Sequence, residues 1–164
     1  AFVMLLDELP GRAFALPQGS GAMMTGGFKG RSRIVDEAEL RQAICEKLGI
    51  PQRALVSEYG MTELCSQLYE PRLELEATAT GRFAAPPWLL VDAVDPATLE
   101  LLPRGAVGLA RFVDLANVDS AVAVQTQDLV RVESDGLVTL LGRPPGAAPR
   151  GCSLSVEAFL RGDA

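Results

Sequence analysis

Residues 54–63 read ALVSEYGMTE, and this stretch decides the fold. Residues 54–57 are predicted to form a short strand. A polar turn, Tyr59-Gly60-Met61-Thr62-Glu63, follows at the carboxyl end of that strand. Because ligands bind in the loops at the carboxyl ends of parallel strands, this turn is a candidate binding loop in a parallel sheet.

A helix that precedes this strand favours a parallel sheet. The pattern predicts the helix over residues 37–48, with Asp36 as its N-cap and Gly49 as its stop signal. Glu37 and Arg41 are spaced to form an i,i+4 ion pair. Apolar side chains recur every four residues on one face of the helix: Leu40, Ile44 and Leu48. The helix therefore presents one apolar face to a core.

A second short apolar run, residues 22–24, precedes the helix, and we interpret it as a buried strand. Residues 22–57 then form a strand, a helix and a strand, a unit that places its two strands side by side and parallel. The loop Thr25-Gly26-Gly27 follows the first strand, so we expect it at the same edge as the turn at residues 59–63. Residues 1–9 are predicted to end an amphipathic helix.

The pattern changes beyond residue 80. Short apolar runs between Pro, Gly and Asp residues predict strands at residues 88–91, 107–112, 122–132 and 137–141. No helical pattern separates them, so we expect a mostly antiparallel sheet or a distorted barrel, with Trp88 in the core. The fold class is therefore α/β, in which a strand-helix-strand segment of a parallel sheet is followed by a mostly antiparallel β subdomain. We place the division at residues 1–80 and 81–164, with a hinge-like segment at the end.

The composition excludes several functions. The net charge is −6 and the basic residues are scattered, which argues against nucleic acid as a partner. There is no histidine, which excludes Ser-His-Asp and Cys-His catalysis within this chain. The cysteines form no CxxC pattern, and their odd number argues against a secreted disulfide framework: Cys45, Cys65 and Cys152. A reducing, cytoplasmic location fits best, and we expect Cys45 to be buried as a small apolar side chain.

The ends and the apolar runs carry two further expectations. No stretch approaches the roughly 20 apolar residues that a membrane span needs, so no span is expected. The chain starts inside an apolar run without an initiator Met, which indicates that it is truncated at its amino terminus.

The turn at residues 59–63 resembles the Tyr-Gly-x-Thr-Glu turn of the adenylate-forming superfamily, which includes acyl-CoA synthetases, peptide-synthetase adenylation domains and luciferases. Other motifs stand in the superfamily's order: Thr25-Gly26-Gly27, Gln125-Thr126-Gln127-Asp128-Leu129 and Leu141-Gly142-Arg143. The resemblance implies that residues 1–80 are part of a nucleotide-binding core and that the cofactors are ATP and Mg²⁺.

The resemblance also assigns roles to the first loop. Gly26, Gly27 and Phe28 belong to the segment that lies against adenine, where residues without bulky side chains let a flat purine approach the backbone. Lys29 follows them and is a candidate for contact with the nucleotide or with an acyl phosphate.

The turn carries the adenine and phosphate contacts of the superfamily. By resemblance Tyr59, followed by Gly60 and Met61, stacks on adenine. Thr62 offers its hydroxyl to the α-phosphate, and Glu63 holds Mg²⁺, a hard cation that prefers oxygen ligands.

Two later residues match the ribose contacts. A carboxylate such as Asp128 accepts hydrogen bonds from both ribose hydroxyls, and a guanidinium such as Arg143 supports ribose or phosphate oxygens. The superfamily's Thr-Gly-Asp segment is Thr126-Gln127-Asp128 here, so the glycine is replaced while the carboxylate is kept.

Within the superfamily, the chain is most similar to the acyl-protein synthetase (LuxE) branch. The similarity is carried by TGGFKGR at residues 25–31, MTELCSQLYE at 61–70, RFVDLAN at 111–117, and GRPPG running to RGCSLS at 142–155. Such enzymes activate a fatty acid with ATP and move the acyl group to a cysteine, from which an acyl-CoA reductase-type partner takes it. Cys152 matches the acyl-carrying position, and Arg150 is a nearby cation able to lower the pKa of its thiol.

Two alternatives stay open. One is an acid–CoA ligase of the phenylacetate type, and the other is a non-catalytic nucleotide-binding or partner subunit. The phosphate loop and the acyl pocket of such enzymes are expected upstream of residue 1, so the 164 residues alone are predicted to show little or no turnover.

Overall fold

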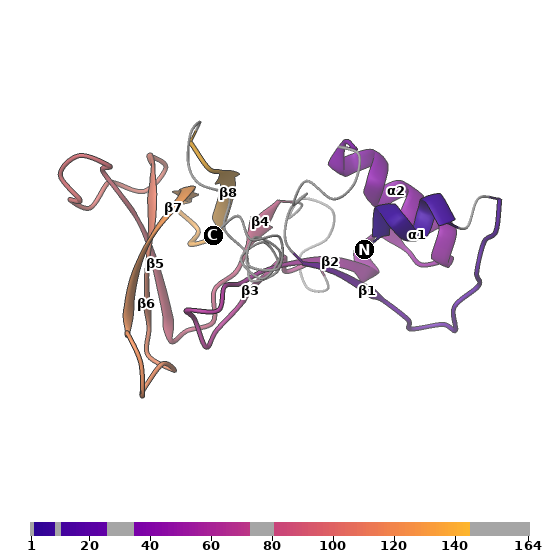
Figure 1. The fold of residues 1–164 in the computed structure, drawn as a ribbon, viewed down its shortest axis with the longest axis horizontal. Coiled ribbons are helices and arrows are strands. Elements are labelled where there is room, and N and C mark those ends of the chain that lie inside the picture. The colour runs from indigo at the N-terminus through magenta and orange to yellow at the C-terminus, as the bar shows by residue number, and fades with distance from the viewer. Residues whose placement is uncertain (1, 9–10, 26–34, 73–80, 145–164) are drawn as a thin grey trace, which may run out of the picture. The chain divides into compact units, whose positions relative to one another are not determined.

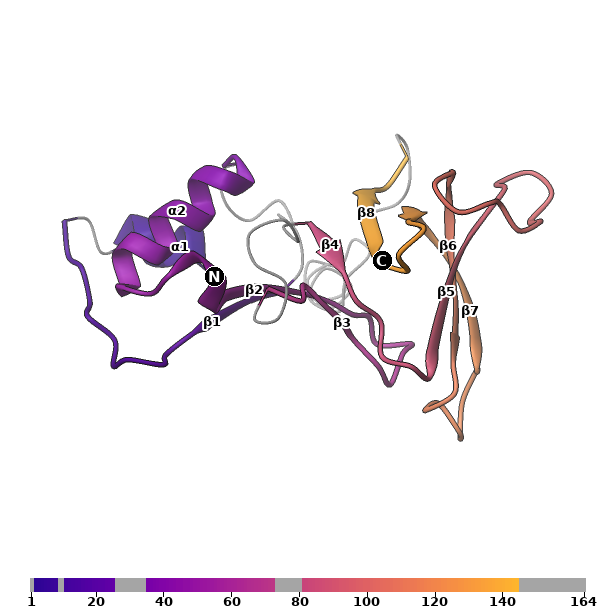
Figure 2. The same ribbon diagram turned by 180° about the vertical axis from the view of Figure 1, so that it is seen from behind.

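The computed structural model describes residues 2–8, 11–25, 35–72 and 81–144, shown as coloured ribbons from two sides in Figures 1 and 2. The chain divides into two compact units. Unit 1 contains Ala1–Tyr59 and Tyr69–Gly81, and unit 2 contains Gly60–Leu68 and Arg82–Ala164. No helix in the described part of the chain is long and apolar enough to cross a membrane.

Unit 1 contains the predicted strand-helix-strand segment. Strands β1 (Ala22–Thr25) and β2 (Leu55–Tyr59) pair in parallel, with Ala22 opposite Leu55 and Thr25 opposite Glu58. The elements around them are α1 (Phe2–Glu8), α2 (Glu37–Leu48), the 3-10 turn η1 (Gln52–Ala54) and β3 (Leu68–Tyr69). The sheet order is β1-β2-β3. The prediction of two parallel strands joined through a helix is confirmed.

Helix α2 begins and ends where the sequence predicts. Asp36 Oδ1 accepts hydrogen bonds from the backbone amides of Ala38 at 2.9 Å and Glu39 at 3.2 Å, which satisfies donors that have no partner within the helix. Gly49 ends the helix in the left-handed conformation, with φ of 64°, which a side chain at this position would strain.

The core of unit 1 forms between its helices and its parallel strands. Helices α1 and α2 lie side by side in both views. Their buried side chains join those that follow α2: Val3, Leu40, Ile44, Cys45, Ile50 and Leu55. Burial of each larger apolar side chain contributes about 1.5–3 kcal/mol before the entropy cost of folding. The expected burial of Cys45 is confirmed.

Strand β1 is not the buried strand that its apolar composition predicts. The side chains of Ala22 and Met24 pack against the core, whereas Met23 is half exposed. Successive side chains of a strand point to opposite faces, so a strand with one covered face buries only alternate residues. The prediction of a strand was right, but the strand is only partly buried rather than buried along its length.

Unit 2 contains the predicted antiparallel sheet. The strands are β4 (Arg82–Phe83), β5 (Leu89–Val94), β6 (Val107–Asp114), β7 (Ala123–Val132) and β8 (Val138–Gly142). They form a five-stranded sheet in the order β4-β8-β7-β6-β5, and every neighbouring pair is antiparallel. Along β6, alternate residues are buried, and Phe112 and Asp114 are fully so. Together the two units make a mixed α/β fold.

Trp88 is not a core residue, contrary to expectation. Its side chain is 51% exposed and lies directly before β5. The indole Nε1–H donates a hydrogen bond to Ser66 Oγ at 3.0 Å. An indole carries one polar hydrogen that needs a partner, and here the partner is the hydroxyl of a buried serine.

Candidate functional site

The two predicted binding loops begin at the same edge of the parallel strands. Thr25 ends β1 and is paired in register with Glu58, the residue before Tyr59. Thr25 is exposed and Tyr59 is half-buried. The sequence prediction that both loops start at this edge is confirmed for these two residues.

Four residues predicted for the first loop cannot be placed against that edge. They lie outside the described residues, as does the predicted acyl-carrying cysteine: Gly26, Gly27, Phe28, Lys29 and Cys152.

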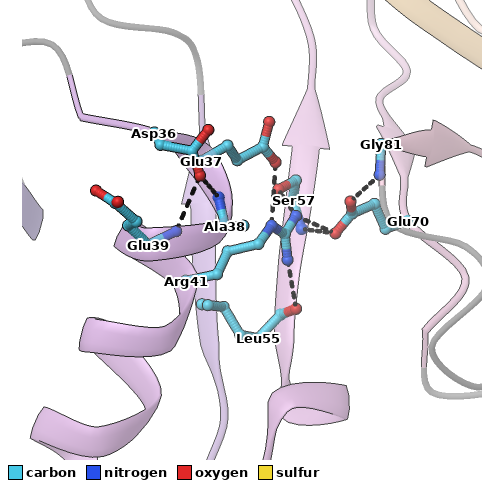
Figure 3. A network of polar contacts seen from close by, with 9 residues as sticks. All are labelled: Asp36, Glu37, Ala38, Glu39, Arg41, Leu55, Ser57, Glu70 and Gly81. Atoms are coloured by element: carbon cyan, nitrogen blue, oxygen red, sulfur yellow. Dashed lines mark hydrogen bonds and ion pairs between the residues drawn. The ribbon is translucent and has the colours of Figure 1, made fainter.

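Behind this edge, a buried arginine joins α2 to β2 (Figure 3). Arg41 is 3% exposed, and its guanidinium donates to Glu70 Oε2 at 2.6 Å, Ser57 Oγ at 2.5 Å and the Leu55 carbonyl at 3.3 Å. Its Nε donates to Glu37 Oε1 at 3.0 Å, so the predicted Glu37–Arg41 pair is confirmed. Burial alone lowers the pKa of Arg41, but the hydrogen bonds to Glu70 and Glu37 outweigh it and raise the pKa above its usual value.

The same network fixes β2 from its other side. Glu70 accepts hydrogen bonds from the backbone amides of Ser57 at 2.9 Å and Gly81 at 2.6 Å, and its own amide donates to the Ser57 carbonyl at 3.0 Å. The strand that leads to Tyr59 is therefore held by side chains as well as by its neighbouring strand.

The Glu37–Arg41 spacing gave no indication of the Glu70 partner. One signal was present in the sequence: Arg41 stands three residues before Ile44 and next to Leu40, at the border of the apolar face.

The part of the predicted turn that belongs to unit 2 presents two polar side chains to solvent. The Leu64 amide donates to the Met61 carbonyl at 3.1 Å and closes a turn in which Thr62 and Glu63 are exposed. The Glu63 carboxylate takes part in no hydrogen bond or ion pair within the part of the chain that the structure describes. An exposed carboxylate on a closed turn is able to bind a cation.

A buried aspartate at the end of β6 holds the residues that follow this turn. Asp114 Oδ2 accepts from the backbone amides of Cys65 at 3.0 Å and Ser66 at 2.9 Å. Its Oδ1 accepts from Ser66 Oγ at 2.9 Å and from the Ala116 amide at 3.0 Å. Burial by itself raises the pKa of Asp114, but these hydrogen bonds favour the charged form and lower the pKa below 3.8.

An asparagine on the same connection holds the turn itself. Asn117 is 5% exposed, and its Nδ2 donates to the carbonyls of Glu63 and Ala121, both at 3.0 Å. Its Oδ1 accepts a weak hydrogen bond from the Cys65 thiol, with Sγ at 3.5 Å. The amide side chain therefore joins the turn at Glu63 to the connection between β6 and β7.

Sequence reasoning assigned no role to Asp114 or Asn117 individually. A signal was present, since Ala110, Phe112 and Asp114 alternate along β6 and all three are buried. A carboxylate at an inward-facing strand position requires buried donors.

The two predicted ribose contacts form an ion pair. Arg143 Nε lies 2.6 Å from Asp128 Oδ1, with the side chains 31% and 15% exposed. Gly142 adopts φ of 82°, a left-handed conformation that glycine reaches without strain, directly before Arg143. Asp128 and Arg143 are 15 residues apart in the sequence, which gave no indication that their side chains are in contact. The structure brings them together within unit 2.

The threonine two residues before Asp128 shapes the local backbone. Thr126 Oγ1 donates to the Ala110 carbonyl at 3.2 Å and accepts from the Asp128 amide at 3.1 Å. The hydroxyl thereby bonds β6 and orients the backbone at Asp128. Gln127, which replaces the glycine of the superfamily motif, is exposed.

The described residues contain no group of three or more Cys, Asp or Glu side chains placed to hold a metal ion. Two cysteines fall within the described part, and both are free thiols: Cys45 is buried and Cys65 is exposed. A metal bound at Glu63 needs further oxygen ligands from a substrate, which suits Mg²⁺ because it binds through one or two carboxylates together with phosphate oxygens.

Comparison with known proteins gives a family and a fold. The family model for acyl-protein synthetase, LuxE, matches residues 4–160. A long-chain-fatty-acid–luciferin-component ligase from Vibrio harveyi is 27% identical over 147 residues, which cover 84% of this chain and 37% of that protein.

Two solved structures share the fold. A long-chain-fatty-acid-CoA ligase from Archaeoglobus fulgidus matches with a TM-score of 0.62 at 15% identity. The match covers 98% of this chain and 34% of the ligase chain. Apo MatB from Rhodopseudomonas palustris matches with a TM-score of 0.54 at 20% identity. The match covers 76% of this chain and 26% of the MatB chain. The chain thus spans about a quarter to somewhat over a third of the length of these relatives, whose fold is that of adenylate-forming enzymes.

Proposed function

The chain belongs to the acyl-protein synthetase (LuxE) family, and we propose that the whole protein activates a long-chain fatty acid with ATP and transfers the acyl group to Cys152. In the first step a carboxylate oxygen of the acid attacks the α-phosphorus of ATP, and pyrophosphate leaves. In the second step the Cys152 thiolate attacks the acyl carbon, AMP leaves, and a thioester forms.

The observation that carries the proposal is the closed turn at residues 61–64. It presents the Thr62 and Glu63 side chains to solvent while its backbone is fixed by buried side chains. A hydroxyl on such a turn is able to donate to phosphate oxygens, and a carboxylate on the same turn is able to hold the cation that neutralises them, with little rearrangement of the backbone during the reaction. Thr62 contacts the α-phosphate in this proposal, and Glu63 holds Mg²⁺, which neutralises phosphate charge when bound.

Asp128 and Arg143 supply the ribose contacts. Their ion pair at 2.6 Å orients the carboxylate. On binding, ribose hydroxyls would donate to Asp128, and the Arg143 guanidinium would donate to ribose or phosphate oxygens. Two partly exposed groups of opposite charge suit a ligand that carries both hydroxyls and phosphates.

The adenine contacts come from the two loops that begin at the edge of β1 and β2. Tyr59 stacks on the base, and the segment Gly26-Gly27-Phe28 lies against its other side, with Lys29 close to the phosphates. The pairing of Thr25 with Glu58 supports this part of the proposal, because it places the starts of both loops together.

Adenylation is tested by ATP–pyrophosphate exchange with the whole protein. Exchange that depends on fatty acid is expected, and Glu63→Gln should reduce it by about 10-fold or more, since a metal ligand is lost. Glu100→Gln is the matched control, because Glu100 is exposed on the connection after β5. Absence of exchange in the wild-type protein contradicts the proposal.

Transfer to cysteine is tested with radiolabelled fatty acid and ATP. The protein should carry label that hydroxylamine releases, and Cys152→Ser should abolish the label while Cys65→Ser keeps it. If Cys152→Ser is labelled as strongly as the wild type, the acceptor assignment is wrong. Release of free acyl-CoA on addition of CoA, without labelled protein, identifies an acid–CoA ligase instead.

The thioester on Cys152 needs an enzyme that consumes it. We assign this step to an acyl-CoA reductase-type partner, which would remove the label in the presence of a reduced nicotinamide cofactor. Label that persists with the partner and its cofactor present argues against this assignment.

A further inference from the structure

We propose that Asp114 and Asn117 are positioning residues, which hold the turn at Thr62 and Glu63 in the geometry that phosphate and Mg²⁺ binding requires. The inference rests on the proposed function, in which Thr62 and Glu63 contact the phosphates and the metal. Neither Asp114 nor Asn117 touches the reacting groups in this proposal. They act through the backbone of residues 63–66.

The contacts of these two side chains fall on successive residues of one short segment. Asn117 binds the carbonyl of Glu63 at 3.0 Å, and Asp114 binds the amides of Cys65 and Ser66 at 3.0 and 2.9 Å. A segment bound at its carbonyl and at two amides has little freedom to rotate. The Met61–Leu64 hydrogen bond closes the turn on the other side of Glu63.

Burial makes these contacts strong. Asp114 is fully buried and Asn117 is 5% exposed, so water does not compete for their hydrogen bonds. The Asp114 carboxylate is charged, and hydrogen bonds to an ionised acceptor are roughly twice as strong as neutral ones. Trp88 adds a further donor to Ser66 Oγ at 3.0 Å, which extends the network to the start of β5.

The exposed side chain of Glu63 gives this anchoring a functional meaning. Its carboxylate takes part in no hydrogen bond or ion pair in the described parts of the chain. Nothing in that region orients the carboxylate except the backbone to which it is attached. An unanchored turn would let the carboxylate sample many positions, and metal affinity would fall with the fraction of correctly placed conformers.

The two stretches involved are far apart in the sequence but meet in unit 2. They are MTELCSQ at residues 61–67 and RFVDLAN at residues 111–117. The second stretch lies at the end of β6, and its last residues form the start of the connection to β7. The network therefore explains why a strand with an apolar alternation ends in a carboxylate and is followed by a buried amide side chain.

Anchoring is tested by hydrogen–deuterium exchange of the whole protein. Asn117→Ala should speed the exchange of amides within residues 61–66 by about 5- to 30-fold and leave the peptides of α2 unchanged. Asp95→Asn is the matched control: Asp95 also accepts from two backbone amides, but at the opposite end of the β5–β6 pair. If Asn117→Ala fails to fold, Asn117→Leu keeps the approximate volume and removes the amide's hydrogen-bonding groups without adding a charge.

Positioning, as distinct from simple stabilisation, is tested by a double-mutant cycle in ATP–pyrophosphate exchange. Asn117→Ala should reduce the exchange rate by about 10- to 100-fold, as loss of a group that orients a metal ligand does. In a background that carries both Thr62→Ala and Glu63→Gln, the same change should reduce the rate by less than about 2-fold, because both groups that Asn117 positions are already absent. A structural role alone gives losses that multiply.

The outcomes separate this inference from the proposed function. The positioning role is wrong if the losses of pyrophosphate-exchange rate multiply in the double-mutant cycle. It is also wrong if Asn117→Ala leaves the hydrogen–deuterium exchange of residues 61–66 unchanged. Either result leaves adenylation as proposed. Wild-type protein without pyrophosphate exchange overturns the proposed function and with it the positioning role. If Glu63→Gln keeps the wild-type rate of pyrophosphate exchange, Glu63 does not hold the metal and there is no reason to position it.

Discussion

Among the described residues, each unit contains a buried carboxylate, Glu70 in unit 1 and Asp114 in unit 2, and the two carboxylates have different partners. Glu70 in unit 1 lies 2.6 Å from the guanidinium of Arg41, and both side chains are almost completely buried. Asp114 in unit 2 accepts four hydrogen bonds, all of them from neutral amides and a hydroxyl. One unit neutralises a buried charge with a cation, and the other spreads it over backbone dipoles.

The difference predicts two kinds of failure. Removal of Arg41 leaves a buried charge that has lost its counter-ion, and the cost of an unpaired charge inside a protein is large. Removal of the Asp114 charge leaves backbone donors short of an acceptor, a smaller cost spread over several groups. The ion pair therefore matters for the stability of unit 1, whereas the Asp114 cluster fixes the course of the chain in unit 2.

The largest effect is expected for Arg41→Met. The change removes the counter-ion of Glu70 and the donor to Ser57 Oγ, so it should lower the free energy of unfolding by about 3–5 kcal/mol. Urea unfolding followed by circular dichroism measures it. Arg53→Met is the matched control, since Arg53 is exposed on η1, and it should change stability by less than about 0.5 kcal/mol.

A double variant shows whether the charge, rather than packing, causes that loss. Arg41→Met combined with Glu70→Leu removes both charges and should recover part of the lost stability. If the double variant is less stable than Arg41→Met by the full cost of Glu70→Leu alone, the two side chains do not act as a pair.

The next effect is expected for Asp114→Asn. The amide that replaces the carboxylate keeps one acceptor and turns a donor towards the Cys65 and Ser66 amides, so the loss at neutral pH should be about 2–3 kcal/mol. Asp119→Asn is the control, because Asp119 is exposed on the same connection. Equal losses in the two variants contradict the role of Asp114.

The difference between wild type and Asp114→Asn should depend on pH. The folded state lowers the pKa of Asp114 below its ordinary value of 3.8, so the folded state holds fewer protons at this group. The resulting stability is complete above the ordinary pKa and is lost as the pH falls through the lower folded pKa. The difference in free energy of unfolding between the two proteins should therefore be constant at pH 5–7 and should shrink as the pH falls below about 4.

The sequence predicts the fold of both units because their local patterns are strong. The four-residue recurrence from Leu40, together with Asp36 and Gly49, gives α2 its correct ends. The runs separated by turn residues give the antiparallel strands, as in β8, where residues 137–141 were predicted and Val138–Gly142 is found. These features depend on neighbours in the sequence, which a single chain displays directly.

Features that depend on distant residues were the ones missed. Nothing near Arg41 indicates that Glu70 lies 2.6 Å away, and nothing near Trp88 indicates that Ser66 supplies its partner. The burial predicted for Met23 failed for the same reason, since a strand's sequence does not state how many of its faces are covered.

The candidate site divides in the same way. The match to superfamily motifs identified the candidate site residues: Tyr59, Thr62, Glu63, Asp128 and Arg143. The side chains that hold the turn come from 48 to 54 residues further along the chain, and the motifs did not indicate them. The roles of the named residues stay predictions, and so does the role of Cys152. The family assignment, which rests on the order of several motifs, is confirmed.

A smaller effect is expected for Trp88→Phe. The change keeps an aromatic ring at a half-exposed position but removes the Nε1–H donor to Ser66 Oγ. The free energy of unfolding should fall by about 1 kcal/mol, the usual worth of one hydrogen bond. In the Asp114→Asn background the loss should be smaller, since the Ser66 hydroxyl no longer bonds the same acceptor. An equal loss in both backgrounds separates Trp88 from the Asp114 cluster.

The smallest effect on stability is expected for Arg143→Met, and it tests whether a pair in unit 2 serves a ligand. The Arg143–Asp128 pair is partly exposed, so its loss should change the free energy of unfolding by less than about 1 kcal/mol. Arg82→Met removes a comparable pair, Arg82 with Asp135 at 2.5 Å, and should cost a similar amount. Calorimetry with ATP should then distinguish the two, because Arg143→Met weakens binding by about 10-fold, as loss of a charge-assisted contact does, while Arg82→Met leaves it unchanged. Equal affinities in both variants mean that the Asp128–Arg143 pair is structural, in which case unit 2 contributes to the nucleotide only through the turn that Asp114 and Asn117 hold.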